Sequence, residues 1–266
     1  MTAVGAVLLD IDGVLTLSWR PIPGAVQAIV AVRDAGYPLA LVTNTSSRTR
    51  GWIADTLAGA GFPVAADDIF TVAQLTATYL AAQYPGARCL LLNDGDLTTE
   101  LPGVTVTGIE DPEPDVIVLG AAGPPFDYPA LNRVFAHLRR GAPLVAMNAN
   151  LYWQTSEGPR LDTGFYLSGL ERAAGVTAEV TGKPAPAFFM TALAALGAEP
   201  AGTLMVGDDL EADVLAAQRL GMTGVLVKTG KYHAESSGTG RPEPVGPDYV
   251  LDSVADLPDL LATLAG

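Results

Sequence analysis

The stretch VGAVLLDIDG, residues 4–13, decides the fold of this chain. Its first six residues form an uninterrupted apolar run, which is typical of a strand buried on both faces. A helical pattern then begins at Pro23-Gly24 and ends at Gly36, and a second apolar run covers residues 38–42. A strand, a helix and a strand in this order predict a βαβ unit, in which the two strands are parallel and the crossover is right-handed.

The same alternation of strands and helices continues to the end of the chain. The next helix is predicted to begin at a cap formed by Ser46 or Ser47 and to reach residue 60. Further strands are predicted over residues 90–92, 116–119, 144–147, 203–206 and 224–227, and further helices over 129–140, 210–220 and 256–264. Residues 234–247, rich in Ser, Gly and Pro, are predicted to form a surface loop.

This order of elements predicts an α/β fold with a parallel, doubly wound sheet of the Rossmann type. The middle of the chain differs because Pro-rich loops interrupt its shorter strands.

The composition excludes several classes of protein. The 266 residues carry 15 Lys and Arg against 29 Asp and Glu, a formal net charge of −14. Phosphate backbones and anionic membrane surfaces repel such a chain, so we expect neither nucleic acid nor membrane as a partner. A single cysteine, Cys89, allows no disulfide framework and no cysteine-based zinc site. The start of the chain lacks a signal-peptide pattern, and we expect a cytoplasmic protein.

Polar residues follow several of the predicted strands, where parallel sheets bind their ligands. Asp10 and Asp12 follow the first strand, Thr43 and Asn44 the second, and a Gly-Asp-Asp sequence at 207–209 a later one. Lys183 follows a short apolar run at 178–180. Each feature alone is usually a turn, a helix cap or a surface residue. Together they predict one site at the carboxyl edge of the sheet.

The residue types at this edge fit phosphoryl transfer. An ionised carboxylate can attack phosphorus, and a second carboxyl group can protonate the leaving oxygen. A divalent cation and a lysine can cancel the repulsion between carboxylates and a phosphate, and Mg²⁺ prefers oxygen ligands. A hydroxyl and backbone N–H groups can hold the phosphoryl oxygens. The residues that can supply these parts are Asp10, Asp12, Thr43, Lys183, Asp208 and Asp213.

The segments 10–15, 41–44, 182–184 and 207–213 resemble the four motifs of the haloacid dehalogenase (HAD) superfamily. The segment 21–25 and the 140 positions between Thr43 and Lys183 resemble its subclass IIA, which carries a C2-type α/β cap. This resemblance implies that residues 1–75 and 178–266 form one core domain and that residues 76–177 form an α/β cap domain inserted into it. The segments 152–158 and 161–164 are similar to the group that includes phospholysine phosphohistidine inorganic pyrophosphate phosphatase.

The resemblance implies a role for each matching residue in the reaction. Asp10 would be the nucleophile and a metal ligand. Asp12 would be the general acid and base, with its backbone carbonyl also on Mg²⁺. Lys183 would orient Asp10, neutralise charge and help bind the phosphate. Thr43 and the backbone of Asn44 would bind phosphoryl oxygens.

The late aspartates would complete the metal site. The resemblance implies that Asp208 ligates Mg²⁺ and that Asp213 supports the metal shell. Asp209 has two interpretations, because it could contribute to the metal or cap the following helix.

Asp12 favours a phosphatase within the superfamily. Loss of halide needs no proton, whereas the leaving group of a phosphate ester does, and dehalogenases resemble this pattern without the second aspartate. We therefore expect a Mg²⁺-dependent phosphatase that acts on a small phosphorylated metabolite through an aspartyl-phosphate. Hydrolysis of inorganic pyrophosphate or of a P–N bond is an alternative. A low-turnover binding protein, or a relative that cleaves carbon–halogen or carbon–phosphorus bonds, also remains open.

The expected cap should close over the site and set its specificity. We expect the loop 148–164 to reach the substrate, with Asn148, Tyr152, Trp153 and Arg160 as candidates. Tyr152 and Trp153 could instead pack within the cap, and Arg160 could be an ordinary surface residue or pair with a second anionic group. The Asp-Gly-Asp sequence at 94–96 is interpreted as a turn. The resemblance also makes a homodimer through the cap an expectation.

Overall fold

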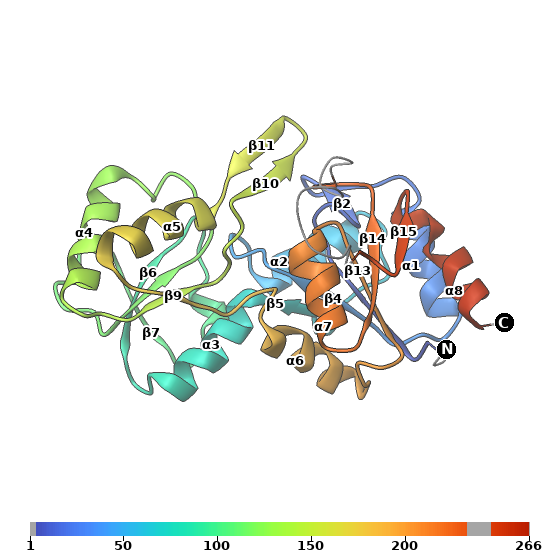
Figure 1. Ribbon diagram of the computed structural model, residues 1–266, viewed down its shortest axis with the longest axis horizontal. Helices are drawn as coiled ribbons and strands as arrows, with labels where there is room; N and C mark the ends of the chain where they lie inside the picture. The colour runs from blue at the N-terminus through green and yellow to red at the C-terminus, as the bar shows by residue number, and fades with distance from the viewer. Residues whose placement is uncertain (1–3, 233–245, 266) are drawn as a thin grey trace.

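The computed structural model describes residues 4–232 and 246–265. The predicted surface loop over 234–247 lies outside these residues, apart from 246 and 247. The described chain forms two lobes that lie side by side (Figure 1). One lobe contains a six-stranded sheet, called the core sheet below, and the other contains a five-stranded sheet, called the cap sheet.

The core sheet has the strand order β15-β14-β13-β1-β4-β5, and all of its strands are parallel. The central strand β1 places Leu9 opposite Val206 of β13 and Leu41 of β4. The predicted α/β fold with a doubly wound parallel sheet is confirmed. The strands are β1 (Ala6–Leu9), β4 (Leu39–Thr43), β5 (Ile69–Thr71), β13 (Thr203–Gly207), β14 (Thr223–Val227) and β15 (Tyr249–Leu251).

Helices cover both faces of this sheet. Successive residues of a strand point to opposite faces, so Leu8 packs in one hydrophobic cluster while Val7 and Leu9 pack in the other. The resulting burial on both sides explains why the strands are continuously apolar. The elements around the core sheet are α1 (Ala25–Asp34), α2 (Arg50–Gly59), α6 (Pro186–Leu196), η3 (Leu210–Leu215), α7 (Ala216–Arg219), α8 (Leu257–Ala265), and the short turns η1 (Ala66–Asp68) and η5 (Val254–Asp256).

Two predicted helices differ in detail. The helix expected over 210–220 begins as the π-helical segment η3 before it continues as α7. The prediction that Ser46 or Ser47 caps α2 is wrong, because the Thr49 hydroxyl accepts the hydrogen bond from the Trp52 amide. Residues 44–49 instead form the connection from β4 to α2, and Ser46 is buried within it.

The second sheet is also parallel, with the order β12-β9-β8-β6-β7. The cap was expected to begin at residue 76, which lies within α3. It was expected to end at residue 177, but strand β12, which comes after that residue, pairs with β9 of the cap sheet. The domain boundaries themselves stay a prediction. The elements of this lobe are β6 (Arg88–Leu92), β7 (Thr105–Thr107), β8 (Val116–Leu119), β9 (Leu144–Ala146), β12 (Glu179–Val180), α3 (Val72–Gln83), α4 (Tyr128–Arg139), α5 (Thr163–Ala174) and the turn η2 (Thr98–Glu100).

Two antiparallel hairpins face each other across the lobes. The expected loop 148–164 contains the hairpin of β10 (Tyr152–Thr155) and β11 (Gly158–Leu161). It projects toward the hairpin of β2 (Thr16–Leu17) and β3 (Arg20–Pro21) (Figure 1). The Ser156 amide donates a hydrogen bond to the Ser18 hydroxyl at 3.1 Å, so the hairpins touch.

Among the described residues, no helix is long and apolar enough to cross a bilayer.

Candidate active site

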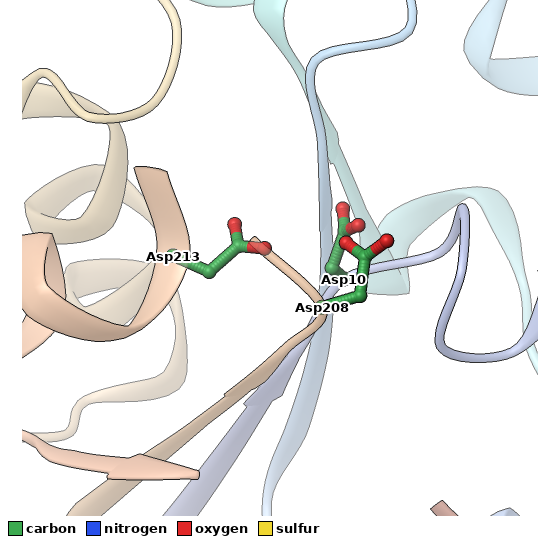
Figure 2. Close-up of side chains that lie close together, drawn as sticks. All are labelled: Asp10, Asp208 and Asp213. Carbon is green, nitrogen blue, oxygen red and sulfur yellow. The ribbon is translucent and has the colours of Figure 1, made fainter. Parts of the chain in front are cut away.

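Three buried carboxyl groups meet at the carboxyl edge of the core sheet. Asp10 directly follows β1, and its amide donates to the Val206 carbonyl oxygen at 2.9 Å. Asp208 directly follows β13, and Asp213 comes from η3. One oxygen of each carboxylate lies within 4.8 Å of the other two. Figure 2 shows Asp10 and Asp208 side by side beyond the strand ends, with Asp213 reaching toward them from the helical turn.

Lys183 brings a positive charge into this cluster. Its ammonium nitrogen lies 2.6 Å from Asp10 Oδ1 and 2.7 Å from Asp213 Oδ1, and it donates to the Val42 carbonyl oxygen at 3.2 Å. Burial disfavours the charged amine, but the two carboxylates outweigh burial and raise the pKa of Lys183. The lysine is therefore charged at neutral pH.

The side chain of Asn44 holds the backbone that carries Lys183. The Asn44 amide donates to the Lys183 carbonyl oxygen at 3.0 Å, and its own oxygen accepts from the Lys183 amide at 2.8 Å. Gly182 permits this approach, because a Cβ there would collide with the Met147 carbonyl oxygen and come within 2.6 Å of Asn44 Oδ1. Lys183 follows β12 of the cap sheet, and the two Asn44 hydrogen bonds hold its backbone against the core in addition to the bonds of its ammonium group.

The electrostatics of the carboxyl cluster favour a bound cation. Burial raises the pKa of Asp10 although Lys183 opposes the shift. Burial and the neighbouring carboxylates raise the pKa of Asp208 well above its usual range. Burial likewise raises the pKa of Asp213 to about 6. Lys183 pairs with two of these carboxylates, Asp10 and Asp213, and not with Asp208. The cluster therefore retains excess negative charge, which a divalent cation would neutralise.

Asp12 lies next to the cluster, but its carboxylate has a different partner. The Thr45 hydroxyl donates to Asp12 Oδ2 at 2.8 Å. Burial raises the pKa of Asp12, and the hydrogen bond from Thr45 opposes that shift. Thr43 is buried at the end of β4, and its hydroxyl accepts from the Thr45 amide at 3.0 Å. Both threonines line the same cavity as Asp12.

The structure favours the capping interpretation of Asp209. Its Oδ1 accepts hydrogen bonds from the amides of Glu211 and Ala212 at 3.1 and 3.0 Å, and its Oδ2 lies 3.2 Å from the ammonium of Lys231. Burial works against ionisation, but Lys231 and the amides outweigh it and lower the pKa of Asp209. Its carboxylate is not one of the three that converge.

Lys231 is a site residue that the sequence analysis did not identify. Its amide donates to Asp208 Oδ2 at 2.8 Å. Lys231 comes a few residues after β14, so its place beyond a strand of the core sheet was a signal that could have found it. Its neighbour Gly230 and the distant Gly13 both lie against Asp208, and a Cβ on either glycine would collide with that carboxylate. The backbone therefore encloses Asp208 closely.

The donor set fits Mg²⁺. The converging groups are all hard carboxylate oxygens, which Mg²⁺ prefers, and a few of them suffice because the ion keeps part of its water shell. The residues that would hold the ion are Asp10 and Asp208, with Asp213 beside them.

Residues from both lobes line one cavity of about 220 Å³ above these groups. The core contributes the carboxyl cluster, Lys183 and Lys231. Of the expected cap residues, Asn148 and Trp153 line the cavity, whereas Tyr152 and Arg160 do not. Arg160 is exposed on β11 and pairs with Glu157 at 2.6 Å. Further lining residues are Trp19, Ser46, Ser47, Arg48, Asp94, Ala121, Ala122, Asn150, Gln154, Asp162 and Ala212.

The cap makes its side of the cavity acidic. Asp94 lies in a bend that follows β6, and Asp162 caps α5 by accepting from the Thr163 amide at 2.7 Å. Burial raises the pKa of Asp162. Within the described part of the chain, the cap places no lysine or arginine in the cavity lining.

Comparison with known families gives two matches. The family described as haloacid dehalogenase-like hydrolase matches residues 7–107, and the one described as HAD-hydrolase-like matches residues 180–257. The two matched segments carry the residues that meet in the cluster, from Asp10 to Asp213.

Similar proteins cover almost the whole chain. Haloacid dehalogenase-like hydrolase domain-containing protein 2 of Bos taurus is 36% identical over 91% of this chain and 91% of its own. Phospholysine phosphohistidine inorganic pyrophosphate phosphatase of Xenopus laevis is 36% identical over 97% of this chain and 94% of its own. Among solved structures, a glycerol phosphate phosphatase from Mycobacterium tuberculosis in complex with magnesium has a TM-score of 0.81 and 31% identity, covering 97% of this chain and 78% of that chain.

Proposed function

The chain belongs to the haloacid dehalogenase-like hydrolases, in subclass IIA, and its relatives include phosphatases; from this premise we propose that it is a Mg²⁺-dependent phosphatase that acts through an aspartyl-phosphate on Asp10. The observation that carries the proposal is the pairing of Asp10 with Lys183 beside two further buried carboxylates. A structural ion pair would not need two further carboxylates beside it, because together with Asp10 they carry more negative charge than Lys183 alone can balance.

The residues have distinct tasks in this reaction. Asp10 attacks the phosphorus atom while the bond to the leaving oxygen breaks, and Asp12 gives that oxygen its proton. Lys183 holds the attacking carboxylate, and the Thr43 hydroxyl is available to the phosphoryl oxygens. Asp12, now ionised, then takes a proton from the water that hydrolyses the aspartyl-phosphate. A Mg²⁺ ion held by Asp10 and Asp208 would neutralise phosphoryl charge.

The negative charge on the cap's side of the cavity favours a substrate whose leaving group is neutral or positively charged. Asp94 and Asp162 add negative charge opposite the core. Arg48, the one arginine that lines the cavity among the residues that the structure describes, comes from the core side and lies 5.2 Å from the ring centre of Trp52. A second phosphate, as in pyrophosphate, would face these carboxylates without a cationic partner from the cap. Phosphate monoesters of small alcohols, or P–N compounds derived from amines, fit the charge better.

An assay with 4-nitrophenyl phosphate tests the mechanism. We expect hydrolysis with Mg²⁺ and none after EDTA treatment, with recovery when Mg²⁺ is restored. Asp10→Asn should abolish hydrolysis while the variant stays folded, because the amide cannot form the aspartyl-phosphate. Full activity of Asp10→Asn, or of the EDTA-treated protein, would refute the mechanism. Halide or phosphonate cleavage in place of ester hydrolysis would move the chain to another branch of its family.

A comparison of substrates tests the leaving group. We expect higher kcat/KM for an ammonium-bearing phosphate ester and for a neutral polyol phosphate than for inorganic pyrophosphate. A preference for pyrophosphate would contradict the charge argument. Absence of turnover with every phosphate and Mg²⁺ would favour a binding protein that retains the fold.

A further inference from the structure

The hydrogen bond between Thr45 and Asp12 joins two separate strand ends. Asp12 belongs to the segment after β1, and Thr45 to the segment after the neighbouring strand β4. The Thr45 hydroxyl donates to Asp12 Oδ2 at 2.8 Å, and the Thr45 amide is itself fixed by the Thr43 hydroxyl at 3.0 Å. The donor is thus held by its own backbone and presents its hydroxyl to one chosen oxygen.

In the described part of the chain, Thr45 is the side chain that holds the Asp12 carboxylate. Lys183 pairs with Asp10 and Asp213, and Lys231 pairs with Asp209, so neither lysine is bonded to Asp12. A free carboxyl group could rotate and present either oxygen to the substrate. A hydroxyl bound to Oδ2 removes that freedom and leaves Oδ1 for proton transfer.

We propose that Thr45 is a positioning residue, whose hydroxyl holds Oδ2 of Asp12 so that Oδ1 transfers the proton. This inference rests on the proposed phosphatase function. In the first step the Asp12 O–H bond breaks and the leaving oxygen gains the proton as its bond to phosphorus breaks. In the second step Oδ1 takes a proton from water as the new O–P bond forms and the Asp10–phosphorus bond breaks.

Removal of the Thr45 hydroxyl should therefore impair proton delivery selectively. An alkyl phosphate needs a proton on its leaving oxygen, whereas 4-nitrophenolate leaves with little help. General acid catalysis contributes about 10²- to 10⁴-fold, so Thr45→Val should lower kcat/KM for the alkyl ester by roughly 10- to 100-fold. Its kcat/KM for 4-nitrophenyl phosphate should change much less. The comparison uses kcat/KM because this ratio covers the steps up to formation of the aspartyl-phosphate, whereas kcat also includes hydrolysis of that intermediate, which is common to both esters.

Two further variants distinguish positioning from a general structural effect. Thr45→Ser keeps the hydroxyl and should restore the wild-type ratio of kcat/KM for the two esters. Thr49→Val is the matched control, because the Thr49 hydroxyl caps α2 and does not line the cavity. It should change the unfolding temperature and leave the ratio of the two rates unchanged.

The two esters also separate this inference from the proposed function. A wild-type protein that hydrolyses neither ester overturns both. Wild-type activity on both esters, with Thr45→Val lowering kcat/KM equally for the two or Thr45→Ser failing to restore the ratio of kcat/KM, overturns only the role of Thr45. If Thr45→Val does not fold, Thr45→Ser provides the test. A ratio of kcat/KM for the two esters that differs from the wild-type ratio, although the hydroxyl is present, contradicts the inference.

Discussion

Lys183 and Asp10 are 173 positions apart in the chain, yet the ammonium group of Lys183 donates a hydrogen bond to Asp10 Oδ1 at 2.6 Å. Both side chains are almost fully buried. The pair crosses from the segment that follows the cap sheet to the first strand of the core. In the proposed mechanism, the reaction therefore depends on how the segment after β12 packs against the end of β1.

Replacement of this lysine should damage both stability and activity. Lys183→Met leaves Asp10 and Asp213 without their shared partner, and breaking a buried ion pair costs about 3 kcal/mol. Activity on 4-nitrophenyl phosphate should fall at least about 100-fold, since one preorganised donor to the reacting groups is lost. Chemical denaturation and steady-state kinetics measure the two effects.

Lys228 provides the control for that experiment. It forms a pair with Asp252 at the same 2.6 Å distance, but both groups are largely exposed. Water screens such pairs, so Lys228→Met should leave stability and activity nearly unchanged. Equal effects of the two substitutions would show that burial does not distinguish the pairs.

The pKa of Asp213 predicts how the stability of the metal-free protein depends on pH. Its pKa is raised from 3.8 to about 6 by burial, so the folded state binds the proton more tightly than the unfolded state. The stabilisation is complete below about pH 4 and is lost as pH rises through about 6, by up to about 3 kcal/mol. Asp213→Asn should remove this contribution when urea unfolding is compared between pH 4 and pH 7 in EDTA. An identical pH dependence in wild type and variant would contradict the prediction.

Gly13 should be needed to keep the metal site open. Gly13 and Gly36 both have φ of +81°, so alanine at either position is strained by about 1–2 kcal/mol. A Cβ at Gly13 would also collide with Asp208, whereas one at Gly36 would meet nothing within 4 Å. Titration calorimetry should show weaker Mg²⁺ binding for Gly13→Ala and unchanged binding for Gly36→Ala. Wild-type affinity in Gly13→Ala would show that Asp208 is not a ligand.

The two cap candidates Trp153 and Arg160 should behave differently. They are cross-strand neighbours in the β10–β11 hairpin, but Trp153 lines the cavity and Arg160 pairs with Glu157 outside it. Loss of an aromatic contact with the substrate should raise KM for a polyol phosphate roughly tenfold in Trp153→Ala. Arg160→Ala should leave KM unchanged. A larger effect of Arg160→Ala would mean that the hairpin moves to bring the arginine to the substrate.

The core strands could be predicted because their apolar runs are nearly continuous. A strand buried on both faces, such as β1, has no other pattern available to it. The hairpin β10–β11 lacked such a signal, since most of its residues are exposed or half-buried and it contains Pro159. The start of α2 was misplaced because Ser46, Ser47 and Thr49 are all good caps, so residue type alone does not distinguish them, and the helix begins after Thr49.

The sequence by itself determined the family, the order of the strands and helices along the chain, and the presence of Asp10, Asp12, Lys183 and Asp208 at the ends of apolar runs. The dimer and the cellular compartment stay predictions. Only the tertiary structure showed which side chains contact one another. Lys183 lies between two carboxylates, the Thr45 hydroxyl donates a hydrogen bond to Asp12, and Arg160 lies outside the cavity. Periodicity reports which face of an element is buried, whereas a hydrogen bond depends on distances of a few tenths of an ångström between segments far apart in the chain.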